Sequence, residues 1–463
     1  MEEFLGIGSD MQNVYDKAKE KLFNTDEVLD ENTKTLIGDY VEELKCKASY
    51  FERLILRYGS LLDYDELKNH GFGKDKISKI FDEDKAYLES VENFYEDNHK
   101  KREYMFGYPS NMENDSCLSS YLRYLESKLY LMNNCGDPYE RGNYGMDSKE
   151  TERKILEIFA ENYGLKKGEY WGYVTSGGTE SNFWAIREGF SRYPGGILYF
   201  SKEAHYSVEK FVSASSAVYP YVKVETLPNG KISVEDFKNK VAENNKKYGY
   251  KPVILVLTWG TTKEGAIDDV KEITDFLKNE GIEYYCHLDA ALFGGIDKRQ
   301  LNAPSITDVL SLNVDSVSVS LHKYLGASRA NGILISLKKG LSKKIDYIGQ
   351  DDSTFLGSRD FPPFSTLQRI KEFKSRKTDD HYYKNVKFFA DLLNENGIFF
   401  ETFNDKTNIF VINKPSEALC KKYQLATFSA DGAEKAHIII MPFHSVKIMK
   451  EFASDLKNDY KRF

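Results

Sequence analysis

Cysteine is scarce and scattered in this chain of 463 residues. The five cysteines are Cys46, Cys117, Cys135, Cys286 and Cys420, and no two of them form a CxxC pair. An odd number without paired spacing argues against a disulfide framework and a zinc site, and it is typical of a protein in a reducing compartment. The sequence also contains no HExxH motif, so a zinc hydrolase is a poor candidate.

Long apolar runs and an excess of basic residues are absent as well. No run approaches the ~18–20 apolar residues that a membrane-spanning helix needs. The N-terminal MEEFLGIGSDMQN has no basic stretch followed by an apolar core, as a signal peptide would. The formal net charge of −8 argues against nucleic acid as a partner. We therefore expect a cytoplasmic protein that binds neither membrane nor nucleic acid.

Residues 1–100 have the spacing of charged amphipathic helices. Apolar side chains recur at helical intervals, for example at Leu54, Ile55 and Tyr58, and this part carries no chemical motif. The pattern predicts a helical N-terminal extension. It could pack on the main domain or on a second subunit.

Residues 101–380 alternate between strand and helix patterns. GILYFS precedes HYSVEKFVSAS, and KPVILVLTW precedes DVKEITDFLKNEG. The run at 251–259 is continuously apolar, as expected of a strand that is buried on both faces. This rhythm predicts a large α/β domain in which helices enclose a mostly parallel sheet.

Residues 381–463 have a different pattern. A helix, HYYKNVKFFADLLNENG, is followed by short strand-like segments, IFFETF, NIFVINK and AHIIIMPF, and then by a last amphipathic helix. The sequence therefore predicts a small C-terminal α+β domain.

Lys323 and Asp289 are the first candidate catalytic residues. Lys323 follows an apolar strand pattern, VSVSLH, and Asp289 ends another in HLDAALFGG. A buried carboxylate needs a cationic partner. The protonated ring nitrogen of pyridoxal phosphate would serve, and a lysine would hold the aldehyde of that cofactor as a Schiff base.

A glycine turn supplies the candidate phosphate site. TSGGTESN at 175–182 sits between a strand and a helix, where open α/β sheets bind ligands. Gly178 allows close backbone approach, Thr179 offers a hydroxyl, and the free N–H groups of a helix start favour an anion. Ser320 and His322 can reach the same phosphate.

The remaining candidates concern the cofactor ring. His205 could stack on the ring, bond the substrate carboxylate or relay a proton. Thr262 could donate a hydrogen bond near the cofactor. Ala291 is small enough to let a ring lie flat against the strand.

At these residues the chain resembles the group II pyridoxal-phosphate decarboxylases, above all bacterial histidine decarboxylases and plant serine decarboxylases. The resemblance runs from about residue 104 to 446 through GYPSN, WGYVTSGGTESN, KEAHYSVEK, GTTKEGAIDD, HLDAALFGG, SVSVSLHK and DSTFLGSR. It implies fold type I, the fold of aspartate aminotransferase. It also implies pyridoxal 5'-phosphate as cofactor and no metal.

The resemblance also implies a role for each candidate. Lys323 becomes the Schiff-base lysine, Asp289 the partner of the ring nitrogen and His205 the stacking residue. The phosphate and ring neighbours become Gly178, Thr179, Thr262, Ala291, Ser320 and His322. On the substrate side the implied residues are Tyr108, Asn111, Ser353 and Thr354. The last two lie in a loop that is expected to reach the active site of the second subunit in a homodimer.

The implied reaction is decarboxylation of an L-amino acid to its amine and CO2. Histidine is the first-choice substrate and serine the second, while an aromatic or acidic amino acid stays open. The proton donor to Cα could be His205 or a hydroxyl of the 350s loop. Two alternatives differ in class: another fold type I carbon–carbon or carbon–sulfur lyase, and a non-catalytic interaction protein that retains the fold.

Overall fold

The computed structural model describes residues 90–461, apart from 92, 114–115, 129–131, 216–218, 296–308, 376–379, 405–406 and 431. The chain divides into two compact units, Met1–Asn98 and His99–Phe463. The predicted helical extension therefore lies almost entirely outside the described residues. Within the described part, no helix is both long and apolar enough to cross a membrane.

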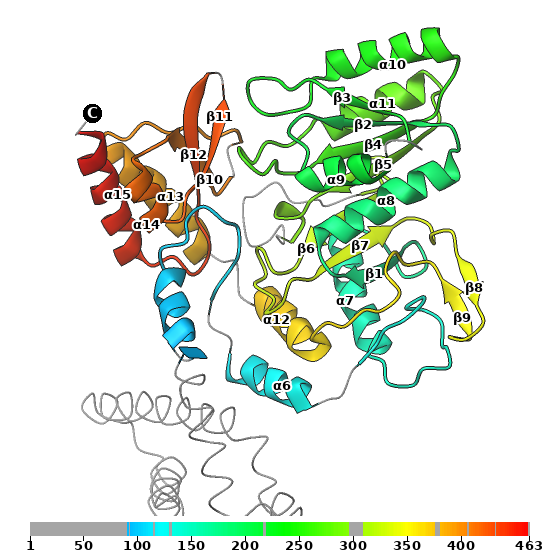
Figure 1. The fold of residues 1–463 in the computed structure, drawn as a ribbon, viewed down its shortest axis with the longest axis horizontal. Helices are drawn as coiled ribbons and strands as arrows, with labels where there is room; N and C mark the ends of the chain where they lie inside the picture. The colour runs from blue at the N-terminus through cyan, green and yellow to red at the C-terminus, as the bar shows by residue number, and fades with distance from the viewer. Residues whose placement is uncertain are drawn as a thin grey trace, which may run out of the picture. The chain divides into compact units, whose positions relative to one another are not determined.

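A seven-stranded sheet forms the centre of the second unit (Figure 1). All of its strands run in one direction except β7, which is antiparallel to both neighbours, so the predicted mostly parallel sheet is confirmed. In spatial order the strands are β1 (Trp171–Thr175), β7 (Gly332–Ser336), β6 (Ser316–Ser320), β5 (Tyr284–Asp289), β4 (Val253–Thr258), β2 (Ile197–Ser201) and β3 (Tyr221–Val224).

Helices cover both faces of this sheet. They are α7 (Lys149–Asn162), α8 (Gly178–Arg192), α9 (Tyr206–Ser215), α10 (Val234–Tyr248), α11 (Val270–Asn279) and α12 (Pro363–Ser375), with a short 3-10 turn, η1 (Phe293–Gly295). A further helix, α6 (Cys117–Lys128), packs on α12. Every residue of β4 is buried. Val253 and Leu255 join the core that includes α10 and α11, whereas Ile254 and Val256 join the core under α8 and α9. Burial on both faces explains the continuous apolar run of this strand.

A three-stranded antiparallel sheet and three helices follow. The strands are β10 (Ile409–Asn413), β12 (Ala433–Ile439) and β11 (Ala426–Ala430), and the helices are α13 (Asp380–Glu395), α14 (Glu417–Lys422) and α15 (Val446–Tyr460). The predicted strand IFFETF is reduced to a single bridge between Glu401 and Val411. A separate hairpin, β8 (Lys343–Ile345) and β9 (Gln350–Asp352), had no counterpart in the sequence prediction.

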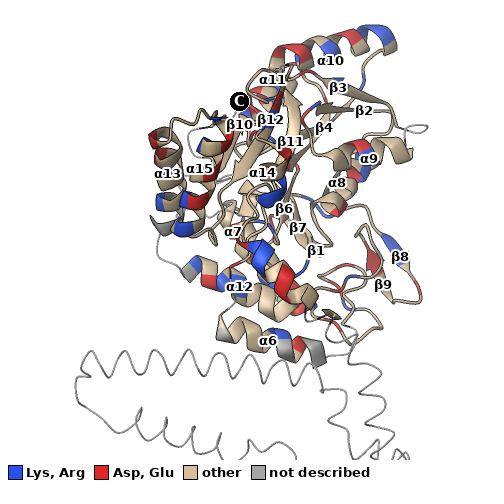
Figure 2. Cartoon of the chain, turned by 60° about the vertical axis from the view of Figure 1, so that its left-hand side comes forward, with Lys and Arg blue, Asp and Glu red and all other residues tan. Residues whose placement is uncertain are grey.

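Charged residues of both signs lie on the outer helices (Figure 2). On α10, for example, Glu235 and Asp236 lie in the first turn and Lys246 and Lys247 in the last, where each sign complements the helix dipole. Mixed charge of this kind is typical of a solvated helix face.

Candidate active site

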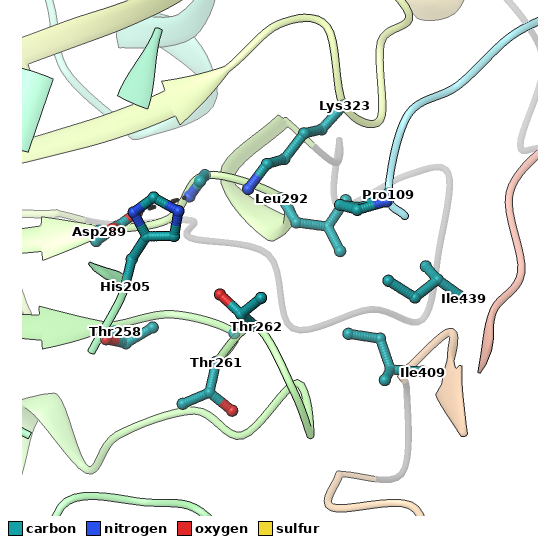
Figure 3. A pocket seen from close by; sticks show the side chains of 12 residues that line it. Pro109, His205, Thr258, Thr261, Thr262, Asp289, Leu292, Lys323, Ile409 and Ile439 are labelled. Carbon is teal, nitrogen blue, oxygen red and sulfur yellow. Dashed lines mark hydrogen bonds between the residues drawn. The ribbon is translucent and has the colours of Figure 1, made fainter. Parts of the chain in front are cut away.

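A pocket opens at the carboxyl ends of β4, β5 and β6 (Figure 3). Its empty space is about 400 Å³, a figure that includes open solvent. Its lining residues are Pro109, His205, Thr258, Gly260, Thr261, Thr262, Asp289, Ala291, Leu292, Lys323, Ile409 and Ile439. The fold thus brings together five of the residues singled out from the sequence: Lys323, Asp289, His205, Thr262 and Ala291.

Lys323 occupies a tight turn directly after β6. Its N–H donates to the carbonyl of Ser320 at 3.3 Å, and its own carbonyl accepts from the N–H of Asn111 at 2.8 Å. Burial lowers the pKa of the Lys323 ammonium, and the Asp289 carboxylate partly opposes that shift. A lowered pKa enlarges the fraction of free amine, which is the form that can attack a carbonyl group.

Asp289 ends β5 and is only 4% exposed. One carboxylate oxygen accepts a hydrogen bond from Asn182 Nδ2 at 2.7 Å, and the other accepts from the N–H of Ala291 at 3.2 Å. These two donors hold the carboxylate in place while it faces the pocket. It can therefore accept a further hydrogen bond from a protonated ring nitrogen.

The turn between β1 and α8 leaves open space where the phosphate site was predicted. Gly177 has φ 145°, a conformation that favours glycine, and a Cβ on it would meet nothing within 4 Å. A Cβ on Gly178 would lie 3.0 Å from Ser320 Oγ and 3.8 Å from the Cβ of Ala291. The helix start at Gly178–Thr179 and the end of β6 therefore meet, and together they form a cradle for an anion.

His322 lies on the turn that carries Lys323, two residues after Ser320. Its Nδ1 contacts the carbonyl of Asn331 at 3.0 Å. A carbonyl only accepts, so Nδ1 carries the proton. Burial lowers the pKa of His322.

His205 follows β2 at the start of α9 and lies beside Asp289 in Figure 3. Its Nδ1 is 2.8 Å from Ser207 Oγ. Burial lowers the pKa of His205, and the nearby Lys323 adds to that effect, whereas Asp289 opposes it. The imidazole is therefore held in its neutral form, with one face available to a ring in the pocket.

The four predicted substrate residues are not among the described residues that line the pocket. Tyr108 is 51% exposed, and Asn111 is buried with its Nδ2 donating to the carbonyl of Tyr324 at 2.9 Å. Pro109, between them, is the residue of this segment that lines the pocket. Asn111 instead braces the turn that carries Lys323.

Ser353 and Thr354 are buried against their own chain. The carbonyl of Ser353 accepts from Trp184 Nε1 at 2.7 Å, and the carbonyl of Thr354 accepts from Arg187 at 3.2 Å. Both partners, Trp184 and Arg187, belong to α8. Ser353 and Thr354 of the same subunit are not among the described residues that line the pocket.

Several lining residues were not singled out from the sequence. Thr258 ends β4, and its buried hydroxyl has no hydrogen-bond partner among the described residues. Leu292, Ile409 and Ile439 form an apolar wall, which lies across the pocket from Asp289 and His205. Position at the end of a buried strand could have revealed Thr258. Nothing local marks Ile409 and Ile439, which come from the small sheet.

The donor set fits a flat heterocycle that carries an aldehyde and a phosphate. The Lys323 amine and the Asp289 carboxylate lie in one pocket, and the Thr258 hydroxyl is left for a further polar group. The glycine turn adjoins this pocket at Ala291, whose Cβ lies 3.8 Å from the position of a Cβ on Gly178. The described residues include no cluster of His, Cys, Asp or Glu suited to a metal ion.

Comparisons with known proteins agree with this geometry. Residues 195–369 match the pyridoxal-dependent decarboxylase conserved domain. Serine decarboxylase 3 of Oryza sativa subsp. japonica is 34% identical, over 75% of this chain and 77% of the relative. Histidine decarboxylase of Pseudomonas entomophila is 33% identical, over 78% of this chain and 87% of the relative.

Solved structures give the same fold. L-methionine decarboxylase from Streptomyces sp. 590, in complex with L-methionine methyl ester, superposes with a TM-score of 0.67 at 21% identity. The match covers 84% of this chain and 96% of that one. Glutamate decarboxylase of Lactobacillus brevis superposes with a TM-score of 0.62 at 14% identity, over 78% and 88% of the two chains. Both have the predicted architecture, fold type I.

Proposed function

Because this chain belongs to the family of pyridoxal-dependent decarboxylases, we propose that its substrate is L-histidine, which it converts to histamine and CO2. L-Serine is the second candidate. The reaction class follows from the family: the protein is a pyridoxal 5'-phosphate-dependent amino acid decarboxylase. Relatives at about one-third identity are named for both substrates, so the choice between histidine and serine depends on the pocket.

The observation that carries the proposal is the distribution of charge in the pocket. Among the described lining residues, Lys323, Asp289 and His205 are the ionisable ones, and all three are assigned to the cofactor end. The opposite wall consists of Pro109, Leu292, Ile409 and Ile439. The described residues of this wall offer no counter-charge, which disfavours an acidic side chain because an unpaired carboxylate would lose its hydration there. A neutral imidazole can pack on such a wall through its ring face.

The cofactor supplies an electron sink for the pair of electrons left behind when CO2 departs. The chain's own residues would hold the cofactor and the substrate for this reaction. Lys323 would provide the amine that holds the cofactor aldehyde. Asp289 would accept the hydrogen bond of the protonated ring nitrogen, and His205 would cover the ring. The apolar wall would exclude water and position the substrate side chain.

Kinetics with defined substrates test the proposal. Purified protein with added pyridoxal 5'-phosphate is supplied with L-histidine, L-serine, L-tyrosine or L-glutamate, and the amines are measured by mass spectrometry. We expect kcat/KM to be highest for L-histidine. A higher value for L-serine would favour the second candidate, and turnover of L-glutamate alone would contradict the argument from the apolar wall.

Two other outcomes would point to a different class. Products formed without CO2 would indicate a carbon–carbon or carbon–sulfur lyase. Protein that shows no visible absorption band after the cofactor is added would support a non-catalytic interaction protein.

We further propose that the enzyme is a cytoplasmic homodimer in which residues 351–359 reach the partner's active site. Support comes from the resemblance, and from the exposed apolar side chains Leu341, Tyr347 and Leu356 in and around this loop, which are 58%, 84% and 41% exposed. Light scattering tests the dimer. Mixing Lys323→Ala protein with Thr354→Trp protein under exchange tests the shared site: recovered activity supports it, and a mixture that stays inactive contradicts it. Cell fractionation tests the compartment.

A further inference from the structure

A buried amide, Asn182 on α8, connects Asp289 to His205. Its Nδ2 donates to Asp289 Oδ2 at 2.7 Å and to Ser207 Oγ at 2.9 Å. Its Oδ1 contacts His287 Nε2 at 3.0 Å and Ser318 Oγ at 3.1 Å. The side chain is 1% exposed, and all four of its hydrogen-bonding positions are filled.

The Asp289 carboxylate determines which way the amide faces. An ionised carboxylate only accepts hydrogen bonds, so the NH2 group of Asn182 must point toward it. The amide oxygen therefore faces His287, and His287 must carry its proton on Nε2. Oδ1 is then an acceptor for Ser318 as well.

The surroundings of His287 agree with this assignment. Its Nδ1 lies 2.8 Å from Ser316 Oγ, and Ser316 in turn accepts from the hydroxyl of Tyr285 at 2.9 Å. Ser316 can thus donate to Nδ1. Burial lowers the pKa of His287 to about 4, so this ring is neutral near pH 7.

On the other side of Asn182 the chain of donors continues to His205. Ser207 Oγ accepts from Asn182, so its own proton is free to be donated to His205 Nδ1 at 2.8 Å. The backbone N–H of Ser207 also points at this nitrogen, at 3.3 Å. Two donors facing Nδ1 leave the proton of a neutral His205 on Nε2.

We propose that Asn182 and Ser207 are positioning residues that hold His205 in its Nε2–H tautomer. The same Asn182 amide also holds the carboxylate of Asp289. Figure 3 shows one ring nitrogen of His205 facing the pocket on the side of Lys323. A neutral ring with Nε2–H is a hydrogen-bond donor at that position and cannot accept a proton there. It therefore donates to an anionic group of the substrate, the α-carboxylate. This last step rests on the proposed function, whereas the tautomer does not.

The test follows the proton on His205 directly. Full-length, cofactor-loaded protein is labelled with 15N in the imidazole rings, and long-range 1H–15N spectra show which nitrogen is protonated. The chain contains eight histidines, and the spectrum of His205→Gln identifies the signals of His205. We expect the wild type to have its proton on Nε2. A proton on Nδ1 would overturn the proposal.

Asn182→Asp is the decisive variant because it is isosteric and position 182 does not touch His205. A carboxyl group shares at most one proton with Asp289, so it cannot also donate to Ser207. The Ser207 hydroxyl must then donate to residue 182 and accept from His205 at the shorter of the two contacts, 2.8 Å against 3.3 Å for the Ser207 N–H, which moves the proton to Nδ1. An unchanged tautomer in folded Asn182→Asp protein contradicts the proposal. Ser207→Asp, which places an acceptor beside Nδ1, predicts the same movement and replaces Asn182→Asp if that variant does not fold.

Asn385→Asp is the matched control. Asn385 is a buried amide on α13, and its Nδ2 donates to the carbonyl of His444 at 3.3 Å. Its replacement should alter the signals of His444 and leave those of His205 unchanged.

Kinetics give a second readout. Loss of the Nε2–H donor should raise KM by at least about tenfold, since hydrogen bonds to charged groups are worth that much. KM is compared at equal cofactor content, because residue 182 also contacts Asp289. A variant that changes the tautomer but leaves KM at the wild-type value would show that substrate binding does not depend on the tautomer. It would overturn the proposal that Nε2–H donates to the α-carboxylate. The spectra need no turnover, so they stand even if L-histidine is not the substrate.

Discussion

Thr258 and Asp289 are register partners on the neighbouring parallel strands β4 and β5, and both line the pocket. Both carboxylate oxygens of Asp289 already accept hydrogen bonds from the protein. The Thr258 hydroxyl, by contrast, is buried without a partner among the described residues. A buried polar group in that state has a cost that a bound cofactor could remove.

Thr258→Val should therefore separate stability from cofactor binding. Removing an unpaired hydroxyl should leave the melting temperature of the cofactor-free protein unchanged or higher. Affinity for pyridoxal 5'-phosphate should fall about three- to tenfold, the value of one neutral hydrogen bond. Fluorescence titration and thermal unfolding measure the two quantities.

Thr274→Val is the control for that variant. Thr274 is also buried, but its hydroxyl donates to the carbonyl of Leu312 at 2.9 Å. This substitution should lower stability by about 1 kcal/mol and leave cofactor affinity unchanged. If Thr258→Val instead lost stability as Thr274→Val does, the Thr258 hydroxyl would have a partner within the protein.

Asp289→Asn should bind the cofactor and lose most of the rate. An amide can still accept from Asn182, so the fold of the site is retained, but it cannot hold a proton on the ring nitrogen by charge. We expect kcat to fall about 10²–10³-fold, as for the loss of one electrostatic contact in other active sites. Steady-state rates at saturating cofactor measure it. If Asp289→Asn had wild-type kinetics, Asp289 would not be the residue that keeps the ring nitrogen protonated.

Glu264 should make stability depend on pH. Burial raises the pKa of Glu264 from 4.5 to about 7, and the nearby Glu203 adds to the shift. The folded state then binds more protons than the unfolded state between these values, so stability is lost as pH rises from about 4.5 through 7. The loss is on the order of 3 kcal/mol.

Urea unfolding at pH 5 and pH 8 checks this expectation. Glu264→Gln should gain stability relative to the wild type at pH 8 and little at pH 5. Glu157→Gln, on the exposed face of α7, should show no such difference. A wild type that becomes more stable than Glu264→Gln as pH rises would reverse the sign and refute the account.

Much of the large domain could be predicted from local pattern. The continuous apolar run that became β4 reflects burial on both faces, and the motifs around Lys323, Asp289 and His205 lie at strand ends or helix starts. The antiparallel β7 was not predicted, because direction is set by pairing with β1 and β6 and leaves no local signal. The domain boundaries at 100 and 380 remain predictions.

The finer parts of the site depended on contacts that are distant in sequence. Asn182 lies in the quoted TSGGTESN motif, yet its importance comes from meeting Ser207 and Asp289, which lie on other elements. In GYPSN, the sequence indicated Tyr108 and Asn111, whereas the fold directs Pro109 into the pocket. Which residue of a turn faces inward depends on how that turn is anchored, here by the N–H of Asn111 on the carbonyl of Lys323.

The most direct test of the central claim is a product screen with a matched pair of lysine variants. Wild-type protein, Lys323→Ala and Lys271→Ala are each incubated with pyridoxal 5'-phosphate and the twenty amino acids, and amines are detected by mass spectrometry. Lys271 is an exposed residue of α11 paired with Asp275. The account predicts one amine, histamine, from the wild type and Lys271→Ala and none from Lys323→Ala. More than a few per cent of wild-type activity in Lys323→Ala would contradict it.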